Sequence, residues 1–164
     1  MIDAPDETSR ANASEKFYAS ISIWSYKSTV IDDKHYSKYI WQRVTNAADR
    51  YNEPGKFTAF IGYEWSSFGS EGPDGSEGKG NLHRVVLFKD GANKADKILP
   101  FSVFDSPNPE DLWGFLDSYQ KTTGGEVLAI PHNGNLSNGE MFSVVNSHGD
   151  PMDSKYAKTR SRWE

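Results

Sequence analysis

Three side chains in this sequence combine metal-binding chemistry with a position beside an apolar stretch: Glu64, His83 and His132. Each lies at or near the end of a strand-like run, FTAFIGYEW, NLHRVVLF or VLAIPHNGN. Strands fix the direction of their side chains, while a neighbouring loop leaves room for a substrate. Because the sequence has no cysteine, a metal site here must use histidine and carboxylate ligands. The pattern predicts a metallohydrolase site, or a part of one.

Each of these residues also has a purely structural interpretation. A lone histidine at a strand start, such as His83, is usually a surface or hydrogen-bonding residue. Glu64 fits a solvated carboxylate or a partner of Arg84, and His132, directly after Pro131, fits a turn cap. A carboxylate at the end of an apolar strand is costly, however, unless it is paired or bound to a metal. Taken together, the three residues are the candidate catalytic and metal-binding set.

The remaining polar candidates have weaker signals. Asn133 and Asn135 follow His132 in a loop-forming stretch, where they are candidates for contacts to a substrate or to a metal ligand. His35 and His148 lie in polar surroundings without a strand end, so we interpret both as surface residues.

Other functional classes lack their signatures. The sequence contains no P-loop, no Gly-x-Ser-x-Gly nucleophile turn, and no dinucleotide fingerprint after a strand. A glycan-binding or protein-binding surface built on Trp24, Trp41, Trp65 and Trp113 is an alternative function. Against it, Trp41 and Trp113 are predicted on helices, where tryptophan commonly packs into a core.

Two long helices are predicted from the spacing of apolar residues. The first runs from Asp33 to Tyr51. The second begins after Asn108 as N-cap, has Pro109 in its first turn, and ends at Gly124. The predicted buried stripes are Tyr36, Tyr39, Ile40, Val44, Ala47, Ala48 and Tyr51 on the first helix, and Leu112, Trp113, Phe115, Leu116 and Tyr119 on the second.

The order of helices and strands favours an α/β fold. Glycine, serine and acids dominate residues 66–80, which we predict to be a long flexible loop. The remaining predictions are strands over 57–64, 82–88 and 126–130, short helical pieces near 139–146 and 154–162, a weakly helical segment over 17–30, and a flexible lead-in over 1–14.

Size and charge narrow the possible partners. A chain of 164 residues suits a single domain, 1–164. The formal net charge of -5, without a basic stripe, argues against nucleic-acid binding. No apolar run approaches the roughly 18 residues that cross a bilayer, and no signal peptide is present, so we expect a soluble chain of unassigned compartment. A small-molecule substrate is the expected partner.

Several long runs resemble one known family. They are FTAFIGYEWSS, NLHRVVLFKDGANKADKILPFS, NPEDLWGFLDSYQKTTGGEVLAIPHNGNLSNGEMF and YAKTRSRWE. Together they are similar to a bacterial PHP-like metallohydrolase family catalogued as domain of unknown function 3604, and the likeness covers residues 34–164. The family is related to the polymerase and histidinol phosphatase (PHP) domain and, more distantly, to amidohydrolases. The resemblance implies an α/β fold that is part of a distorted (β/α)7 barrel.

The resemblance also implies roles for the candidate ligands. The run Gly62-Tyr63-Glu64 matches a Gly-x-Glu motif whose carboxylate bridges two metals, and His83 and His132 match positions that each bind one metal. The implied cofactor is a divalent transition metal, Zn, Mn or Fe. The implied reaction is hydrolysis of a phosphoester or related ester, with two metals lowering the pKa of a bridging water toward about 7.

The sequence departs from the family pattern in two places. It has no His-x-His pair, and the closing ligand motif of the family is missing after Trp163. We therefore expect an internal part of a longer protein, with weak metal binding and no activity of its own. A catalytically silent structural segment is the alternative.

Overall fold

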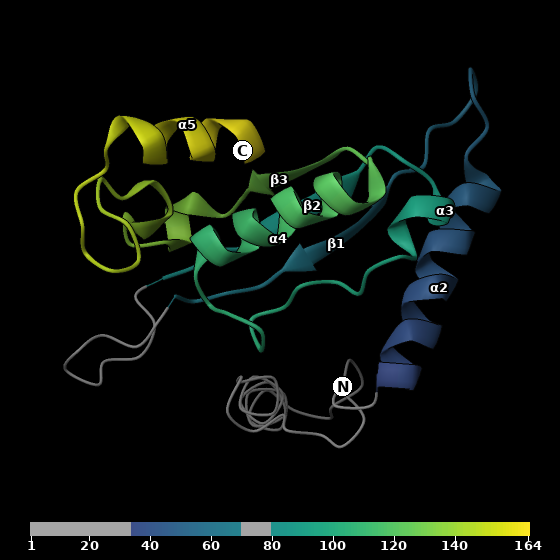
Figure 1. Cartoon of the computed structure of the whole chain (residues 1–164), viewed down its shortest axis with the longest axis horizontal. Helices are drawn as coiled ribbons and strands as arrows, with labels where there is room; N and C mark the ends of the chain where they lie inside the picture. Colours follow the sequence, from purple (N-terminus) through teal and green to yellow (C-terminus); the bar gives the residue numbers. More distant parts are fainter. Residues whose placement is uncertain (1–33, 70–79) are drawn as a thin grey trace, which may run out of the picture. The chain divides into compact units, whose positions relative to one another are not determined.

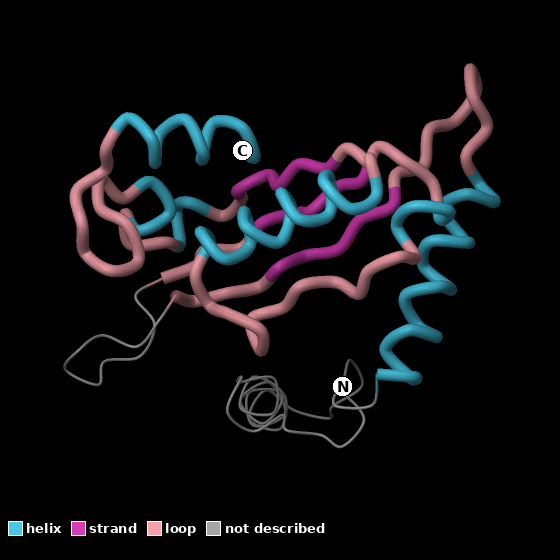
Figure 2. Tube along the Cα trace, viewed as in Figure 1, coloured by secondary structure: helices cyan, strands magenta, loops and turns pink. Residues whose placement is uncertain are grey.

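The computed structural model describes residues 34–69 and 80–164 (Figure 1). The chain divides into two compact units, residues 1–39 and 40–164, and the candidate site lies in the second. The predictions for residues 1–14, 17–30 and 70–79 lie outside the described residues. The elements, in chain order, are α2 (Lys34–Tyr51, which spans the boundary of the units), β1 (Ile61–Trp65), β2 (Arg84–Phe88), α3 (Ala92–Ala95), α4 (Pro109–Thr123), β3 (Val127–Pro131), the 3-10 turns η1 (Gly134–Leu136) and η2 (Glu140–Phe142), and α5 (Ser154–Trp163) (Figure 2).

The three strands form one antiparallel sheet in the order β1-β2-β3. At one end of the sheet Trp65, Arg84 and Pro131 lie opposite one another, and at the other end Ile61 pairs with Phe88. The mixed α/β class expected from the sequence is confirmed. The described strands differ from the implied (β/α)7 barrel, in which neighbouring strands run parallel. Within the described residues the sheet does not close into a barrel.

One face of this sheet carries the core. Successive strand residues point to opposite faces of a sheet. The alternating burial along the three strands therefore places buried side chains on one face and more exposed side chains on the other. Helix α4 packs on the buried face, where Tyr119 meets Phe88 edge to face at 5.0 Å, and Figure 1 shows α4 in front of the strands. The buried residues are Ile61, Trp65, Val86, Phe88, Val127 and Ala129 from the sheet, and Leu112, Trp113, Leu116 and Tyr119 from α4.

The range predicted for helix α2 is confirmed, but the prediction of its buried residues is wrong. From Ile40 onward its buried residues are Trp41 and Thr45, while Ile40, Val44 and Tyr51 are exposed. Trp41 donates its indole N–H to the Ala95 carbonyl at 3.0 Å and packs on the core aromatics. Aromatic side chains occur on more than one side of this helix, and tertiary packing selected the side with the largest ring.

Helix α4 follows its prediction closely. It begins at Pro109 and ends at Gly124, which has φ 64 and so adopts the left-handed conformation that glycine tolerates best. Four of the five predicted stripe residues are buried. The fifth, Phe115, is half-buried and stacks on Phe101 with ring centroids 5.2 Å apart.

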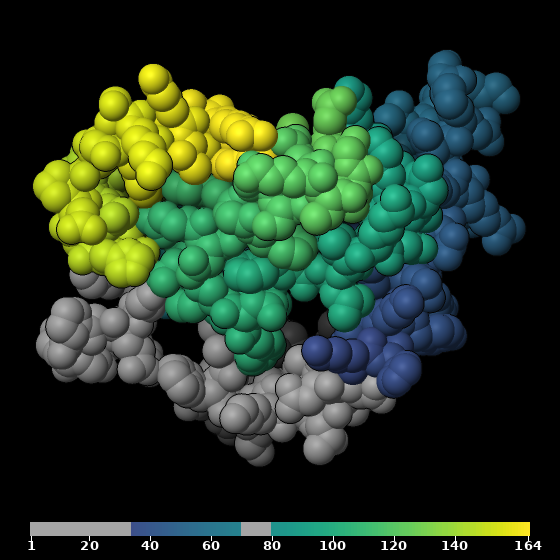
Figure 3. Space-filling view, viewed as in Figure 1, coloured from purple at the N-terminus to yellow at the C-terminus, as the bar shows by residue number. Residues whose placement is uncertain are grey.

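The remaining boundaries differ slightly from the predictions. Strand β1 begins at Ile61 instead of residue 57, because its partner β2 ends at Phe88, directly opposite Ile61. The short helix α3 was not predicted. Helix α5 confirms the predicted piece over 154–162, and the Asp153 carboxylate caps it by accepting the Tyr156 N–H at 2.7 Å. Figure 3 shows the C-terminal residues in yellow against the green residues of α4 and β3, which they contact.

Among the helices that the structure describes, none is both long and apolar enough to cross a bilayer.

Asp90 ties together the sheet end that lies away from the candidate ligands. Its carboxylate accepts hydrogen bonds from Lys94 Nζ and from the Glu126 N–H, each at 2.6 Å. Lys94 Nζ also donates to the Gly124 carbonyl at 2.8 Å. The hydrogen bond from Lys94 lowers the pKa of Asp90, because it favours the ionised carboxylate. The ionised form therefore stabilises the folded state.

We expect Asp90→Asn to lower the free energy of unfolding at pH 7 by about 1 kcal/mol, since one charged hydrogen-bond partner near the surface is lost. The ordinary pKa of Asp is 3.8, and the folded value is lower. The stabilisation is therefore complete above this ordinary value and is lost as pH falls through the folded pKa. Urea unfolding from neutral to acidic pH should show the difference between variant and wild type shrinking in acid.

Glu53→Gln is the matched control, because Glu53 pairs with Lys56 while both side chains are largely exposed, at 62% and 80%. A difference for Asp90→Asn that persists undiminished in acid would contradict the assigned role of the Asp90 charge.

Candidate metal centre

The antiparallel register brings the three predicted ligands to one end of the sheet. Glu64 is near the end of β1 and His132 directly follows β3, whereas His83 directly precedes β2. Because β2 runs against its neighbours, its start lies beside their ends. The register places His83 opposite His132, and the His132 N–H donates to the His83 carbonyl at 3.2 Å. Glu64 pairs with Val85 and is therefore a diagonal neighbour of His83 on the same face.

The side chains converge on one carboxylate oxygen. Glu64 Oε1 lies 2.8 Å from His83 Nδ1 and 3.7 Å from His132 Nε2. One ligand atom from each residue lies within 4.8 Å of those of the other two. Nitrogen and oxygen ligands bound about 2.0–2.1 Å from a zinc ion lie about 3 to 3.5 Å from one another. The two separations from Glu64 Oε1 lie on either side of this range, so the three groups are close to the spacing that a single metal ion requires.

Neighbouring groups shield and orient the ligands. Ser66 Oγ donates to Glu64 Oε1 at 2.9 Å, and the Phe68 ring meets the His83 ring edge to face at 5.2 Å. The exposed fractions of the side chains rise from 14% for His83 through 27% for His132 to 47% for Glu64. The site is thus shielded on the histidine side and open on the carboxylate side.

The chemistry of the donor set fits a metal ion. His83 Nδ1 and His132 Nε2 face the shared Glu64 oxygen, whereas the other two ring nitrogens, His83 Nε2 and His132 Nδ1, are shielded from solvent and have no hydrogen-bond partner within the described part of the chain. Each histidine therefore has one nitrogen directed at the carboxylate. The donor set of two imidazoles and one carboxylate is also typical of zinc and of other divalent transition metals. The residues present fit such an ion.

Burial lowers the pKa of His83, and this effect outweighs the opposing attraction of Glu64. Burial acts in this direction because it disfavours the charged imidazolium. His83 is therefore held in the neutral form, which is the form that binds metals.

The other polar candidates stand apart from this cluster. Asn133 and Asn135 are both exposed, and Asn133 adopts a left-handed backbone, φ 60, that starts the η1 turn. His35 and His148 are exposed, in agreement with their interpretation as surface residues. Among the candidates within residues 34–69 and 80–164, the structure therefore brings together Glu64, His83 and His132, and the asparagine roles stay predictions.

Two alternatives from the sequence do not fit the described residues. Glu64 is not the partner of Arg84, because the Arg84 side chain points to the opposite face and its Nε lies 2.8 Å from Glu164 Oε1. An exposed tryptophan surface is also not formed by Trp41, Trp65 and Trp113, which are at most 4% exposed. Trp24 lies outside the described residues.

Sequence reasoning missed two residues beside the ligands, Ser66 and Phe68. Ser66 had a usable signal, because it follows Glu64 by two residues and so shares its face under strand periodicity. Phe68 had none, since it lies in a loop whose path depends on tertiary contacts.

A separate cavity of about 200 Å³ lies on the core side, between β2, α4, η2 and α5. Phe68 and Arg84 line it, but none of the three candidate ligands does. Burial is the main cause that raises the pKa of Tyr156 on its wall to about 12, with the nearby Glu110 carboxylate acting in the same direction. The phenol is therefore neutral at physiological pH and acts there as a hydrogen-bonding group. The metal ligands face away from this cavity.

Comparison with known proteins identifies one family. Residues 3–164 match the family model described as a protein of unknown function (DUF3604). No curated protein and no solved structure matches the chain. The match covers nearly the whole sequence, including all three candidate ligands.

Gly80 sits where two chain segments beside the site approach each other closely. A Cβ atom at Gly80 would lie 2.2 Å from the Ser137 carbonyl oxygen, which is backbone and cannot swing away. The next residue, Asn81, donates its N–H to the Leu136 carbonyl at 3.1 Å. These contacts hold the segment before His83 against the segment after His132.

Gly80→Ala should therefore push these segments apart, with a loss of about 1 to 3 kcal/mol in unfolding free energy, as overpacking costs elsewhere. Urea unfolding in a chelator measures the loss without a metal. Gly114→Ala is the control, because Gly114 is exposed inside α4 with open space around it, and there alanine should stabilise the helix by about 0.5 to 1 kcal/mol. Equal stability of Gly80→Ala and wild type would show that the close approach is not maintained.

Proposed function

The chain belongs to the DUF3604 family, and we propose that it carries part of the metal site of a PHP-type, metal-dependent hydrolase. Glu64, His83 and His132 are the proposed ligands. The observation that carries the proposal is their convergence: residues in or directly beside three separate strands meet with ligand atoms within 4.8 Å of one another.

The donor set favours zinc, manganese or iron, and one carboxylate and two imidazole ligands would leave a divalent ion with net positive charge. This charge supports an anionic substrate such as a phosphoester or a related ester. A bound divalent metal would acidify water and neutralise negative charge on the departing oxygen.

The surrounding residues have supporting roles in this proposal. Burial keeps His83 neutral, and the Ser66 hydroxyl holds the Glu64 carboxylate in place through its hydrogen bond. Phe68 limits the access of water to the His83 ring. Asn133 and Asn135, exposed directly after His132, are the proposed substrate contacts.

The barrel is a further part of the proposal. In this proposal, β1, β2 and β3 form a distorted, antiparallel section of a larger sheet in the whole protein. Two features support it: within the described residues, β1 and β3 are edges without a further partner strand, and the sheet face that carries the ligands is only partly covered. The exposed residues on that face include Leu128 and Ile130.

Metal binding tests the site directly. The chain, stripped with a chelator and dialysed, should bind zinc or manganese in a calorimetric titration. Glu64→Ala, His83→Ala and His132→Ala should each weaken the affinity at least about tenfold, because even outer groups of metal sites contribute that much. Binding should also raise the melting temperature, since the metal stabilises only the folded state.

His148→Ala is the control, because His148 is an exposed histidine away from the cluster. Wild-type affinity in all three ligand variants would rule out the assigned site, even if the chain still bound metal elsewhere.

Catalysis needs a separate assay with the whole protein. Metal-loaded enzyme should hydrolyse aryl phosphate esters, and both chelation and Glu64→Gln should lower kcat/KM by at least about a hundredfold, a loss of roughly 2.7 kcal/mol of transition-state stabilisation. Asn135→Ala should instead raise KM, as expected for a substrate contact. Hydrolysis that survives both chelation and Glu64→Gln would disprove a metal-dependent mechanism at this site.

A further inference from the structure

Arg84 occupies a special place in the register. Trp65, Arg84 and Pro131 lie opposite one another across the sheet on its core face. Each of them is the direct sequence neighbour of a proposed metal ligand: Glu64 precedes Trp65, His83 precedes Arg84, and His132 follows Pro131. A shift of this row therefore moves all three ligands on the other face.

The Arg84 side chain contacts the chain neighbours of two proposed ligands, Glu64 and His83. The residue is 1% exposed. Its guanidinium lies over the Trp65 ring at 5.7 Å, next to Glu64 in the chain, and also donates to the Leu82 carbonyl, next to His83. Because the planar guanidinium has several donors in fixed directions, it can hold these groups at once.

Glu164 fixes Arg84 from the other side. Its Oε1 accepts hydrogen bonds from Arg84 Nε at 2.8 Å and from the Trp113 indole at 3.1 Å, and its Oε2 accepts one from Arg160 Nε at 3.0 Å. The Glu164 side chain is 6% exposed. Arg160 also donates to the Met141 carbonyl at 2.5 Å. The network thus connects β2 to α4, to α5 and to η2.

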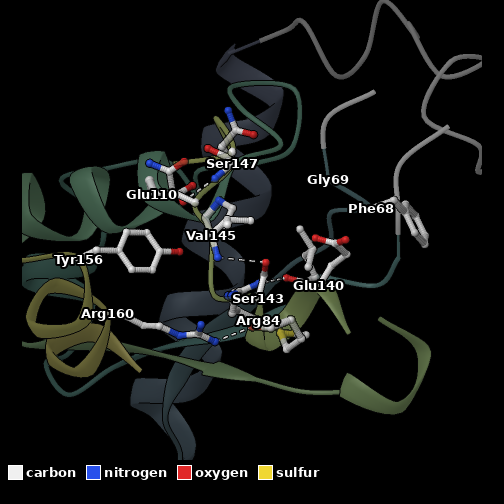
Figure 4. Close-up of a pocket in the computed structure, with 16 residues that line it drawn as sticks. Phe68, Gly69, Arg84, Glu110, Glu140, Ser143, Val145, Ser147, Tyr156 and Arg160 are labelled. Atoms are coloured by element: carbon white, nitrogen blue, oxygen red, sulfur yellow. Dashed lines mark hydrogen bonds between the residues drawn. The ribbon is translucent and has the colours of Figure 1, made fainter. Parts of the chain in front are cut away.

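Figure 4 shows Arg84 and Arg160 on the wall of the same cavity, from β2 and α5 respectively. A buried ion pair is weak evidence for stability, because desolvation of both charges offsets their attraction. Apolar residues of similar size often replace such pairs without loss of stability. The directional hydrogen bonds of Arg84 are instead suited to fix a position, and Arg84 lies in the register between Trp65 and Pro131, which adjoin Glu64 and His132.

We propose that Arg84 is a positioning residue of the metal site, and that its ion pair with Glu164 sets the spacing of Glu64, His83 and His132 from the opposite face of the sheet. The role rests on the proposed function, since it presumes that these three residues bind a metal. It links the C-terminal helix to the metal ligands through a single side chain.

The decisive variant removes both charges while filling the same space: Arg84→Met combined with Glu164→Gln. In a chelator its urea midpoint should remain near that of wild type, because Arg84 and Glu164 lose their charges together, and Arg160, whose side chain is 17% exposed, keeps the Met141 carbonyl as an acceptor. Its affinity for zinc should nevertheless fall at least about tenfold, the range found when outer supports of metal sites are removed. The visible spectrum of the cobalt-loaded protein should change, because it reports ligand geometry.

Trp41→Phe is the matched control. It removes a buried hydrogen bond, from the indole to the Ala95 carbonyl, and keeps an aromatic ring against Tyr63, the neighbour of Glu64. It should lower the urea midpoint and leave both the zinc affinity and the cobalt spectrum unchanged. If it weakens zinc binding as much as the double variant does, affinity merely follows stability and the positioning role is overturned.

The two proposals fail in different ways. A double variant that binds zinc like wild type, with the wild-type cobalt spectrum, overturns the role of Arg84 and leaves the metal site standing. A wild-type chain whose metal binding ignores Glu64→Ala overturns both. If the double variant does not fold, Arg84→Lys replaces it: lysine keeps the charge but lacks the fork, so zinc affinity should still fall at least threefold, and unchanged affinity overturns the role.

Discussion

The candidate site depends on one constraint, the antiparallel pairing of β2 with both of its neighbours. Reversal of the middle strand places its first residues beside the last residues of β1 and β3. His83 thus meets His132 directly across a strand pair, and Glu64 reaches the same point from a diagonal position. A register shift of one residue in β2 would send His83 to the core face and dissolve the cluster.

The same register explains the charged interior of the protein. The face opposite the ligands carries the core, and at the ligand end of this face the core contains a buried arginine instead of an apolar side chain. Arg84 is tolerated because Glu164 neutralises it and the Leu82 carbonyl accepts a hydrogen bond from its Nη1. The candidate ligands and the ion pair of Arg84 with Glu164 therefore lie on opposite faces of the sheet at the same end.

Much of the fold was predictable from local sequence signals. Helix α4 has Pro109 at its start and Gly124 at its end, and both act within a few residues of chain. Its stripe is unambiguous because its apolar residues lie on one side. The stripe on α2 was wrong because Trp41 competes with tyrosines on another side, and only the position of Ala95 decides between them. Strand β1 was predicted too long because a strand lasts only as long as its partner.

The sequence by itself determined which residues have metal chemistry and that each lies at a strand end, because residue type and apolar runs are local properties. It also determined the acidic, cysteine-free composition that limits the ligands to histidine and carboxylate. Only the tertiary structure decided that the three residues share one face, that Ser66 and Phe68 flank them, and that Arg84 pairs with Glu164. These facts depend on strand direction and register, which arise from contacts between residues far apart in the chain.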